Sequence, residues 1–404
     1  MATNLRNRVQ PVVERLEDRL VPAVSAVFAA GRLIVTGTAA SETIEVRQKA
    51  GRISVVGATI NDAGVPRASL AAAKVDVIRI DGGRGNDVLQ FETVAVANPA
   101  SNALNRPIHT RMFGGRGDDT LKGGEGADLL VGGMGSDTLW GRGGSDTLFG
   151  DSQYSGVQTK PFTPGANTTV FNFKESVYYP MTALTTNVDS LNFALAQEAT
   201  PGACGNDKLY GGDGNDILFG GFGNDWLWGG AGNDDLYGMH GVDMLMGDSG
   251  NFTIAGNDRL FGGAGSDFLF GEQGHDYLAG GDDADWLYGG AGDDFLYGEM
   301  GNDRLYGDDG VDRMSGGDGD DQLFGGFGID LLFGDAGNDL LDGGNQYDRS
   351  SNQLIGGAGD DTMINYIWTV DDSIFEEPIW SRDTIRFRGD GADTVIERLT
   401  ATWL

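Results

Sequence analysis

Aspartate recurs every nine residues over long stretches of this chain. From Gly262 to Asp342, nine consecutive units of nine residues carry aspartate at the sixth place, as in GGAGSDFLF and GEQGHDYLA. The same place carries aspartate in the units that begin at Gly211, such as GGDGNDILF, and in an earlier block. Carboxylates held in register repel one another unless cations lie between them. A regular array of this kind is therefore a candidate for cation binding.

The spacing and residue type predict a set of calcium ligands. Calcium is a hard ion that takes about six to eight oxygens from carboxylates and backbone carbonyls. Aspartate side chains and the carbonyls of glycine-rich turns can supply such a cage, so Ca²⁺ is the expected cofactor. The predicted ligands are Asp119, Asp128, Asp137, Asp146, Asp207, Asp216, Asp225, Asp234, Asp243, Asp258, Asp267, Asp276, Asp285, Asp294, Asp303, Asp312, Asp321, Asp330, Asp339 and Asp361.

The residues around each aspartate indicate the elements that position it. Places one to six hold glycines and small polar residues, which accept turn and left-handed conformations. Places seven to nine, such as Phe-Leu-Phe, suit a very short strand with only the middle side chain pointing inward. Leucine or methionine holds place eight throughout the nine-unit run. Turn and strand in alternation predict an all-β parallel β-roll, with two units per coil, two facing parallel sheets and a thin leucine core.

These units resemble the RTX, or haemolysin-type, calcium-binding repeat GGxGxDxUx, a nonapeptide repeat of β-helical proteins. The resemblance covers roughly half of the chain and implies a secreted or surface protein of bacterial type that binds calcium. The competing interpretation is a glycine-rich solenoid whose aspartates only cap turns. Such a solenoid would accept asparagine at place six, whereas the main blocks keep aspartate.

Composition restricts the class of protein. The formal net charge of −32 repels nucleic acid and anionic membrane surfaces and attracts multivalent cations. A single cysteine, Cys204, excludes an intramolecular disulfide framework. No apolar run approaches the roughly 18 residues of a membrane span. We therefore expect a soluble protein with no transmembrane segment and no nucleic-acid partner.

Breaks in the register divide the chain into six predicted segments. Before the main blocks, Gly37–Glu45 is a decayed unit with Glu42 at place six and Ile44 at place eight, and Gly82–Gln90 is a further unit. The tail is rich in aromatic residues and fits the terminal element that a solenoid needs to close its core. The segments are an export- or sorting-like segment at 1–24, a degenerate N-terminal β-solenoid region at 25–113, a first calcium-binding block at 114–150, an insertion at 151–201, a second calcium-binding block at 202–364 and a C-terminal cap at 365–404.

Catalytic motifs are weak against this background. Gly247-Asp248-Ser249-Gly250 matches the GDSG of chymotrypsin-like proteases, but it also fills places one to four of a repeat, and no base motif accompanies it. The three histidines, His109, His240 and His275, are far apart in sequence, and we expect the last two to be turn residues. The HExxH of RTX metalloproteases and the GxSxG of RTX lipases are both missing. The sequence predicts no enzymatic activity.

Place nine is often aromatic, as at Tyr288 and Phe324, and should face outward. Such rings form either a stacked ladder that stiffens the sheet or a flat face that binds another molecule. The predicted function is calcium binding by a secreted or cell-surface repeat protein that folds on calcium and has a structural or adhesive role. Its candidate partners are calcium ions, polysaccharide and cell-surface proteins. The alternative is a carbohydrate-active enzyme, a lyase or hydrolase, or a polysaccharide-binding protein, carried on the roll.

Overall fold

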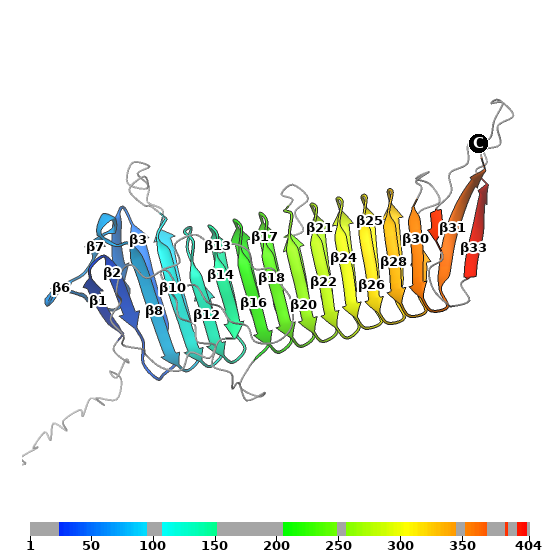
Figure 1. Ribbon diagram of the computed structural model, residues 1–404. Coiled ribbons are helices and arrows are strands. Elements are labelled where there is room, and N and C mark those ends of the chain that lie inside the picture. Colours follow the sequence, from blue (N-terminus) through cyan, green and yellow to red (C-terminus); the bar gives the residue numbers. More distant parts are fainter. Residues whose placement is uncertain are drawn as a thin grey trace, which may run out of the picture.

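The computed structural model describes residues 24–94, 107–151, 205–248, 256–344, 352–369, 384–386 and 394–401. Their strands stand side by side in a long row from β1 to β33 (Figure 1). Within these residues the strands form one 17-stranded and one 16-stranded sheet, and the only helical element is a 3₁₀ turn, Ala72–Lys74. The predicted all-β roll of two long parallel sheets is confirmed.

Successive repeats alternate between the two sheets. The 17-stranded sheet holds β1 (Ser25–Ala29), β2 (Arg32–Thr36), β5 (Ile60–Asp62), β6 (Val65–Arg67), β8 (Val77–Arg84), β10 (His109–Arg116), β12 (Leu129–Met134), β14 (Thr147–Asp151), β16 (Ile217–Phe222), β18 (Asp235–His240), β20 (Arg259–Ala264), β22 (Tyr277–Asp282), β24 (Phe295–Met300), β26 (Arg313–Asp318), β28 (Leu331–Ala336), β30 (Gln353–Ala358) and β32 (Thr384–Arg386). The 16-stranded sheet holds β3 (Thr43–Lys49), β4 (Arg52–Val55), β7 (Leu70–Ala71), β9 (Val88–Val94), β11 (Thr120–Lys122), β13 (Thr138–Gly143), β15 (Lys208–Asp213), β17 (Trp226–Ala231), β19 (Met244–Asp248), β21 (Phe268–Gln273), β23 (Trp286–Ala291), β25 (Arg304–Asp309), β27 (Gln322–Phe327), β29 (Leu340–Asp342), β31 (Thr362–Thr369) and β33 (Thr394–Ala401).

The pairing register shows two units per coil. Strand β21 pairs in parallel with β23, so that Leu269 lies opposite Leu287, eighteen residues later. The strand between them in sequence, β22, belongs to the other sheet and pairs with β20 and β24. Each coil therefore contributes one strand to each sheet. Where the chain makes an insertion, the register widens, as between Leu236 and Leu260, but the pairing is kept.

The strands are longer than the sequence suggested. In β21 the strand runs from place seven of one unit to place three of the next, Phe268–Gln273, and only places four to six form the turn. The prediction of a three-residue strand was therefore wrong. Parallel strands pair through backbone groups at every level of the stack. The glycine-rich places one to three consequently join the ladder despite their low intrinsic strand preference.

Place-eight residues form the core. Leu269, Leu287 and Met314 are completely buried, and the same holds for place eight of the other described repeats. Because the two sheets contribute these residues alternately, the core is one thin layer of leucine along the whole roll. Little apolar area is buried per residue, so other interactions must contribute to order in the turns.

The N-terminal region departs from a simple roll. Strands β1 and β2, β3 and β4, and β5 and β6 pair as antiparallel hairpins. Strands β2 and β3 nevertheless continue the parallel stacks by pairing with β8 and β9. The hairpins cover the first coil, which would otherwise expose unpaired strand edges.

Strands also continue beyond residue 364. Strand β33 pairs in parallel with β31 over eight positions, and β32 pairs with β30 over three. Both sheets are thus extended by the segment predicted to be a cap, and the boundary at 365 stays a prediction. The export-like segment lies almost entirely outside the described residues, and so does the 151–201 insertion apart from Asp151. No helix among the described residues is long and apolar enough to cross a membrane.

Candidate metal centre

The place-six aspartates lie in two columns, each running along one series of turns. The Asp87 column contains Asp87, Asp119, Asp137, Asp207, Asp225, Asp243, Asp267, Asp285, Asp303, Asp321, Asp339 and Asp361. The Asp128 column contains Asp128, Asp146, Asp216, Asp234, Asp258, Asp276, Asp294, Asp312 and Asp330. These residues are at most 4 % exposed. All twenty aspartates named from the sequence therefore fall in two buried columns.

One carboxylate oxygen of each aspartate joins successive coils. The backbone N–H of Asp285, for example, donates to Oδ1 of Asp303 at 2.8 Å, and the N–H of Asp303 donates to Oδ1 of Asp321 at 2.8 Å. The same bond repeats along both columns at 2.6–3.0 Å. Half of each carboxylate thus caps the turn of the preceding coil, as the competing interpretation of the sequence supposed.

The second oxygen, Oδ2, is buried and accepts no hydrogen bond in most of these aspartates. A buried carboxylate oxygen without a partner carries a large desolvation penalty. The residues with this arrangement are Asp87, Asp119, Asp137, Asp146, Asp207, Asp216, Asp225, Asp234, Asp243, Asp258, Asp267, Asp276, Asp285, Asp294, Asp303, Asp312, Asp321 and Asp339. Capping alone leaves this oxygen unexplained.

Place-one glycine leaves room for this oxygen. A Cβ on Gly262 would lie 2.4 Å from Oδ2 of Asp267 and 2.6 Å from the carbonyl oxygen of Gly280 in the next coil. A side chain at this place would therefore collide with both oxygens. Glycine brings a carboxylate oxygen and a carbonyl oxygen to the same small interior space, where both are hydrogen-bond acceptors.

Asn352 shows how the same place is satisfied without a charge. It follows the interruption at 345–351 and takes the position of an aspartate in the Asp128 column. Its Oδ1 accepts the N–H of Asp330 at 2.7 Å, and its Nδ2 donates to the carbonyl of Gly343 at 2.5 Å. In the aspartate units Oδ2 lies beside the place-one glycine, as this amide nitrogen does, but it has no proton to donate. A cation or a proton at Oδ2 would supply the missing partner.

Glycines at places two and four bring the coils close enough for this stacking. Gly263 and Gly265 have φ of +116° and +125°, a region that favours glycine. A Cβ on Gly265 would lie 1.7 Å from the carbonyl oxygen of Gly241 in the preceding coil. Glycine here therefore sets both the turn conformation and the close approach of successive turns.

The electrostatics of the columns favour bound cations. Burial, followed by the charges of Asp267 and Asp303, raises the pKa of Asp285 to about 9, although the N–H of Asp267 opposes the shift. Burial likewise raises the pKa of Asp303 to about 6. A raised carboxyl pKa means that the folded structure disfavours the ionised form. Cations between the carboxylates would reverse this penalty.

The donor set fits calcium better than a metal that needs nitrogen or sulfur. Carboxylate and carbonyl oxygens are the available groups, and these are the ligands of a hard ion. Across the described ranges, no three His, Cys, Asp or Glu side chains converge on one point. A calcium site here would consequently combine aspartate Oδ2 atoms with backbone carbonyls of the turns.

Comparison with known families agrees with this chemistry. The chain matches the RTX calcium-binding nonapeptide repeat (4 copies) at residues 79–90, 113–148, 205–227, 219–251, 252–287, 279–314, 315–350 and 348–364. These matches cover more than half of the 404 residues. The chain belongs to the RTX repeat family. No curated protein matches it at a significant level. Membership in the RTX family indicates calcium binding.

Two place-six residues were not among the predicted ligands. Asp87, at place six of the unit Gly82–Gln90, is 1 % exposed, and its Oδ2 lacks a hydrogen-bond partner. The unit was visible in the sequence, so its aspartate could have been included. Glu42 fills the equivalent position one coil earlier, but its carboxylate accepts hydrogen bonds from the backbone and hydroxyl of Thr38. Glu42 is thus satisfied within its own turn.

The histidines of the RTX roll have structural contacts. His240 is exposed, and its ring stacks on Phe222 with centroids 4.6 Å apart. His275 accepts the N–H of Asp293 at its Nδ1, 2.7 Å away. His109 lies near another coil, with Nδ1 2.8 Å from the carbonyl of Ala127. Of the GDSG motif, Gly247 and Asp248 end strand β19, while Ser249 and Gly250 lie outside the described residues.

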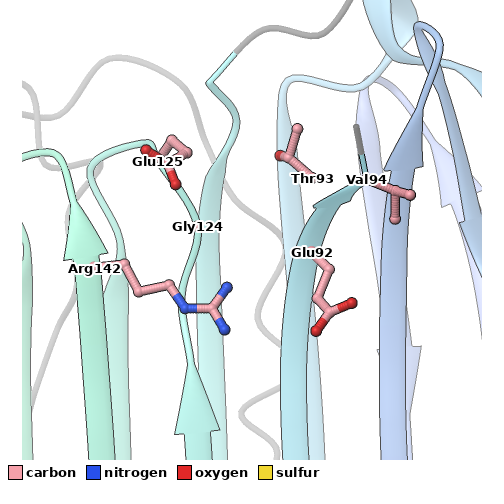
Figure 2. A pocket seen from close by; sticks show the side chains of 6 residues that line it. All are labelled: Glu92, Thr93, Val94, Gly124, Glu125 and Arg142. Carbon is pink, nitrogen blue, oxygen red and sulfur yellow. The ribbon is translucent and has the colours of Figure 1, made fainter. Parts of the chain in front are cut away.

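A shallow pocket of about 340 Å³ lies where the hairpin region meets the repeats (Figure 2). Its lining is Glu92, Thr93, Val94, Gly124, Glu125 and Arg142. Figure 2 shows Arg142 extending across the opening, and its Nη1 donates to the carbonyl of Phe91 at 3.3 Å. The pocket's ionisable lining residues are Glu92, Glu125 and Arg142, and neither histidine nor cysteine is among them.

The place-nine rings form stacked ladders on the outer faces. In the 16-stranded sheet, Phe270, Tyr288, Tyr306 and Phe324 follow one another with centroids 4.7–5.0 Å apart and interplanar angles of 4–10°. The 17-stranded sheet carries a similar series, Phe149, Phe219, Tyr237 and Phe261. Each ring covers the faces of its neighbours, which favours the ladder interpretation over a flat aromatic binding surface.

Proposed function

We propose that this chain is an extracellular calcium-binding β-roll that folds when calcium binds and serves a structural or adhesive role. The observation that supports this most is the second oxygen of the place-six aspartates, which is buried, faces carbonyl oxygens and lacks a hydrogen-bond donor. Calcium would supply the charge that these oxygens need. The residues that would hold it are the aspartates of the Asp87 and Asp128 columns.

Folding is coupled to calcium in this proposal. Without cations, the roll must bury two columns of carboxylates and has only one thin layer of leucine to offset the lost chain entropy. Ligand groups that are assembled only in the folded state turn binding free energy into folding free energy. Bound calcium would therefore supply stabilising free energy that the thin leucine core does not.

The proposed location is outside the cell or at its surface. Extracellular calcium modules typically bind at about 10⁻⁴–10⁻³ M, which is far above cytosolic levels. A chain with such sites would remain unfolded until export and fold afterwards. Membership in the RTX family supports this proposal. The long stacked roll and its ring ladders suit a stiff structural or adhesive element (Figure 1).

Calcium titration of the full chain tests the proposal. The chain is freed of metal at pH 7.5 and followed by far-ultraviolet circular dichroism as Ca²⁺ or Mg²⁺ is added. We expect little β structure in excess EGTA and a cooperative gain with Ca²⁺, but not with an equal concentration of Mg²⁺. Full β structure in EGTA would overturn calcium-coupled folding. A polysaccharide pull-down and a lyase and hydrolase screen on the folded chain then separate the adhesive role from the carbohydrate-active alternative.

A further inference from the structure

One buried carboxylate lies outside the nonapeptide consensus. Asp248 is the place-two residue at the end of β19, immediately before the interruption at 249–255. It is only 3 % exposed, and its Oδ1 has no hydrogen-bond partner. Its carboxylate accepts the N–H of Gly256, and its Oδ2 accepts the N–H of Gln273 in the next coil, 3.3 Å away. The buried Oδ1 is costly here for the same reason as Oδ2 at place six.

Other acidic residues at place two differ from Asp248. Four of them have positive φ: 75° at Glu272, 76° at Glu299, 69° at Asp308 and 73° at Asp335. Asp308 is exposed, and Glu299 is also exposed at the end of its strand. Positive φ is not found at Asp248. Its backbone therefore directs the side chain differently from those of the four residues with positive φ.

The position of Asp248 brings it close to the Asp128 column. The preceding residue, Gly247, lies against this column, since a Cβ on it would be 2.3 Å from Oδ2 of Asp258 and 2.8 Å from the carbonyl of Gly271, while Asp248 itself reaches the next coil at Gln273. The negative charge of Asp248 acts on Asp234, Asp258 and Asp276, the place-six residues of three successive coils. This buried charge adds to the negative charge that a cation in the column would balance.

The same arrangement recurs at the longer interruption. Asp151 is the place-two residue before residues 152–204, and its Oδ2 accepts the N–H of Phe222 in the next coil at 3.0 Å. Its charge acts on Asp137, Asp207 and Asp225 of the other column. These two interruptions therefore begin directly after an aspartate that bonds to place three of the following coil, whereas the interruption at 345–351 follows Gly344.

We propose that Asp248 is an additional calcium ligand, supplying its Oδ1 to the site of Asp258 at the interrupted turn. The inference rests on the proposed calcium binding of the columns. Affinity of oxygen-ligand calcium sites rises with the number of charged ligands and with rigidity. The turn beside the interruption thus becomes a tighter site than the consensus turns. Asp151 has the corresponding role at the longer interruption.

Local hydrogen exchange of the full chain tests this assignment. Protection of peptides within 256–276 is measured against calcium concentration, with peptides within 313–342 as an internal reference. We expect Asp248→Asn to raise the calcium midpoint of the first region about tenfold, because one charged ligand is lost, and to leave the reference unchanged. Asp308→Asn makes the same charge change at an exposed place-two residue and should leave the midpoint of 256–276 unchanged.

The outcomes separate the two proposals. If the parent chain gains no protection with calcium, calcium-coupled folding itself fails. If the parent responds but Asp248→Asn has an equal or lower midpoint, Asp248 is not a ligand and only repels its neighbours. Should Asp248→Asn fail to reach the parent's circular dichroism at saturating calcium, Asp151→Asn carries the same test in peptides within 205–231.

Discussion

At the scale of single residues, the two oxygens of one carboxylate have different tasks. Oδ1 of Asp303 accepts the N–H of Asp285, whereas Oδ2 lies beside Gly298, where a Cβ would be only 2.3 Å away. Asparagine can perform the first task and, as Asn352 shows, can satisfy the second with an amide proton. Aspartate is the better residue only when a cation is present. Aspartate rather than asparagine at place six therefore supports the proposed calcium binding.

Substitution of Asp303 should reveal both tasks. Asp303→Asn keeps the acceptor and removes the charge, so we expect higher stability without calcium and a higher calcium midpoint. Asp303→Ala leaves the buried N–H of Asp285 unpaired, which costs about 1–3 kcal/mol with or without calcium. Urea unfolding at the lowest calcium concentration that folds the parent chain, and again at saturating calcium, measures both effects. Identical behaviour of the two variants at the lower concentration would contradict the division of roles.

The raised carboxyl pKa values predict that the stability of the chain changes with pH in opposite directions without and with calcium. Between the unfolded value of 3.8 and folded values of about 6 for Asp303 and about 9 for Asp285, the folded chain binds more protons than the unfolded chain. Stability of the calcium-free chain should therefore be greatest near pH 4 and fall as the pH rises towards 9. Calcium binds the ionised carboxylates, so the stability of the calcium-loaded chain should instead increase as the pH rises. The β signal in circular dichroism of the metal-free chain, and the urea midpoint of the calcium-saturated chain, are each compared between pH 5 and pH 8. Changes of the same sign would refute this account.

At the scale of the repeat, the sequence predicted the register better than the extent of each strand. The inward position of Leu269 and the outward position of Tyr288 follow from period-two alternation. The pairing of Glu272 with Gly290 could not be predicted in the same way. That pairing arises from stacking of whole coils, which a local preference for turns does not describe.

The missed site residues have a similar explanation. Asp87 could have been predicted from its own unit, since only the repeat pattern is needed. The burial of Asp248 depends instead on a backbone conformation that differs from that of Asp308, although both hold place two. Residue type and place in the unit are the same for the two. The sequence shows only that Asp248 precedes a break in the register, and this break alone does not predict burial.

The ring ladder should contribute to stability rather than to recognition. Tyr288 stacks on Phe270 at 5.0 Å and on Tyr306 at 4.7 Å. Each stacked contact is worth about 0.5–1.5 kcal/mol, so Tyr288→Ala should lower the free energy of unfolding by about 1–3 kcal/mol. Tyr288→Phe keeps the rings and should be nearly neutral. Calcium-saturated urea unfolding measures this. Loss of polysaccharide retention by Tyr288→Ala at unchanged stability would favour a binding surface instead.

At the scale of the whole molecule, the stability of each coil depends on the coils next to it. Each coil pairs with the one before and the one after through both sheets, and the aspartate columns connect the same neighbours. In such a solenoid a defect is felt mainly by adjacent coils, whereas an uncovered end exposes apolar core and strand edges. The hairpins of β1 to β6 cover one end. At the other end, β32 and β33 extend the two sheets beyond the last full repeat.

Removal of residues 365–404 tests whether this terminal segment closes the roll. The deletion removes β32, β33 and residues 365–369 of β31. One edge of β30 and of the remaining part of β31 is then unpaired, and the buried side chains of Leu354 and Met363 lose the strands beyond them. We expect a higher calcium midpoint for the last coils, or aggregation, and a smaller effect towards the middle of the stack. Hydrogen exchange against calcium concentration should show this gradient, with protection lost first in peptides within 322–364. Asp303→Asn is the internal control, because it should disturb its own neighbours, which include β27, and leave peptides within 340–364 unchanged. Equal midpoints for the truncated and parent chains would show that the segment does not act as a cap, and that it is better interpreted as a separate targeting or partner-binding element.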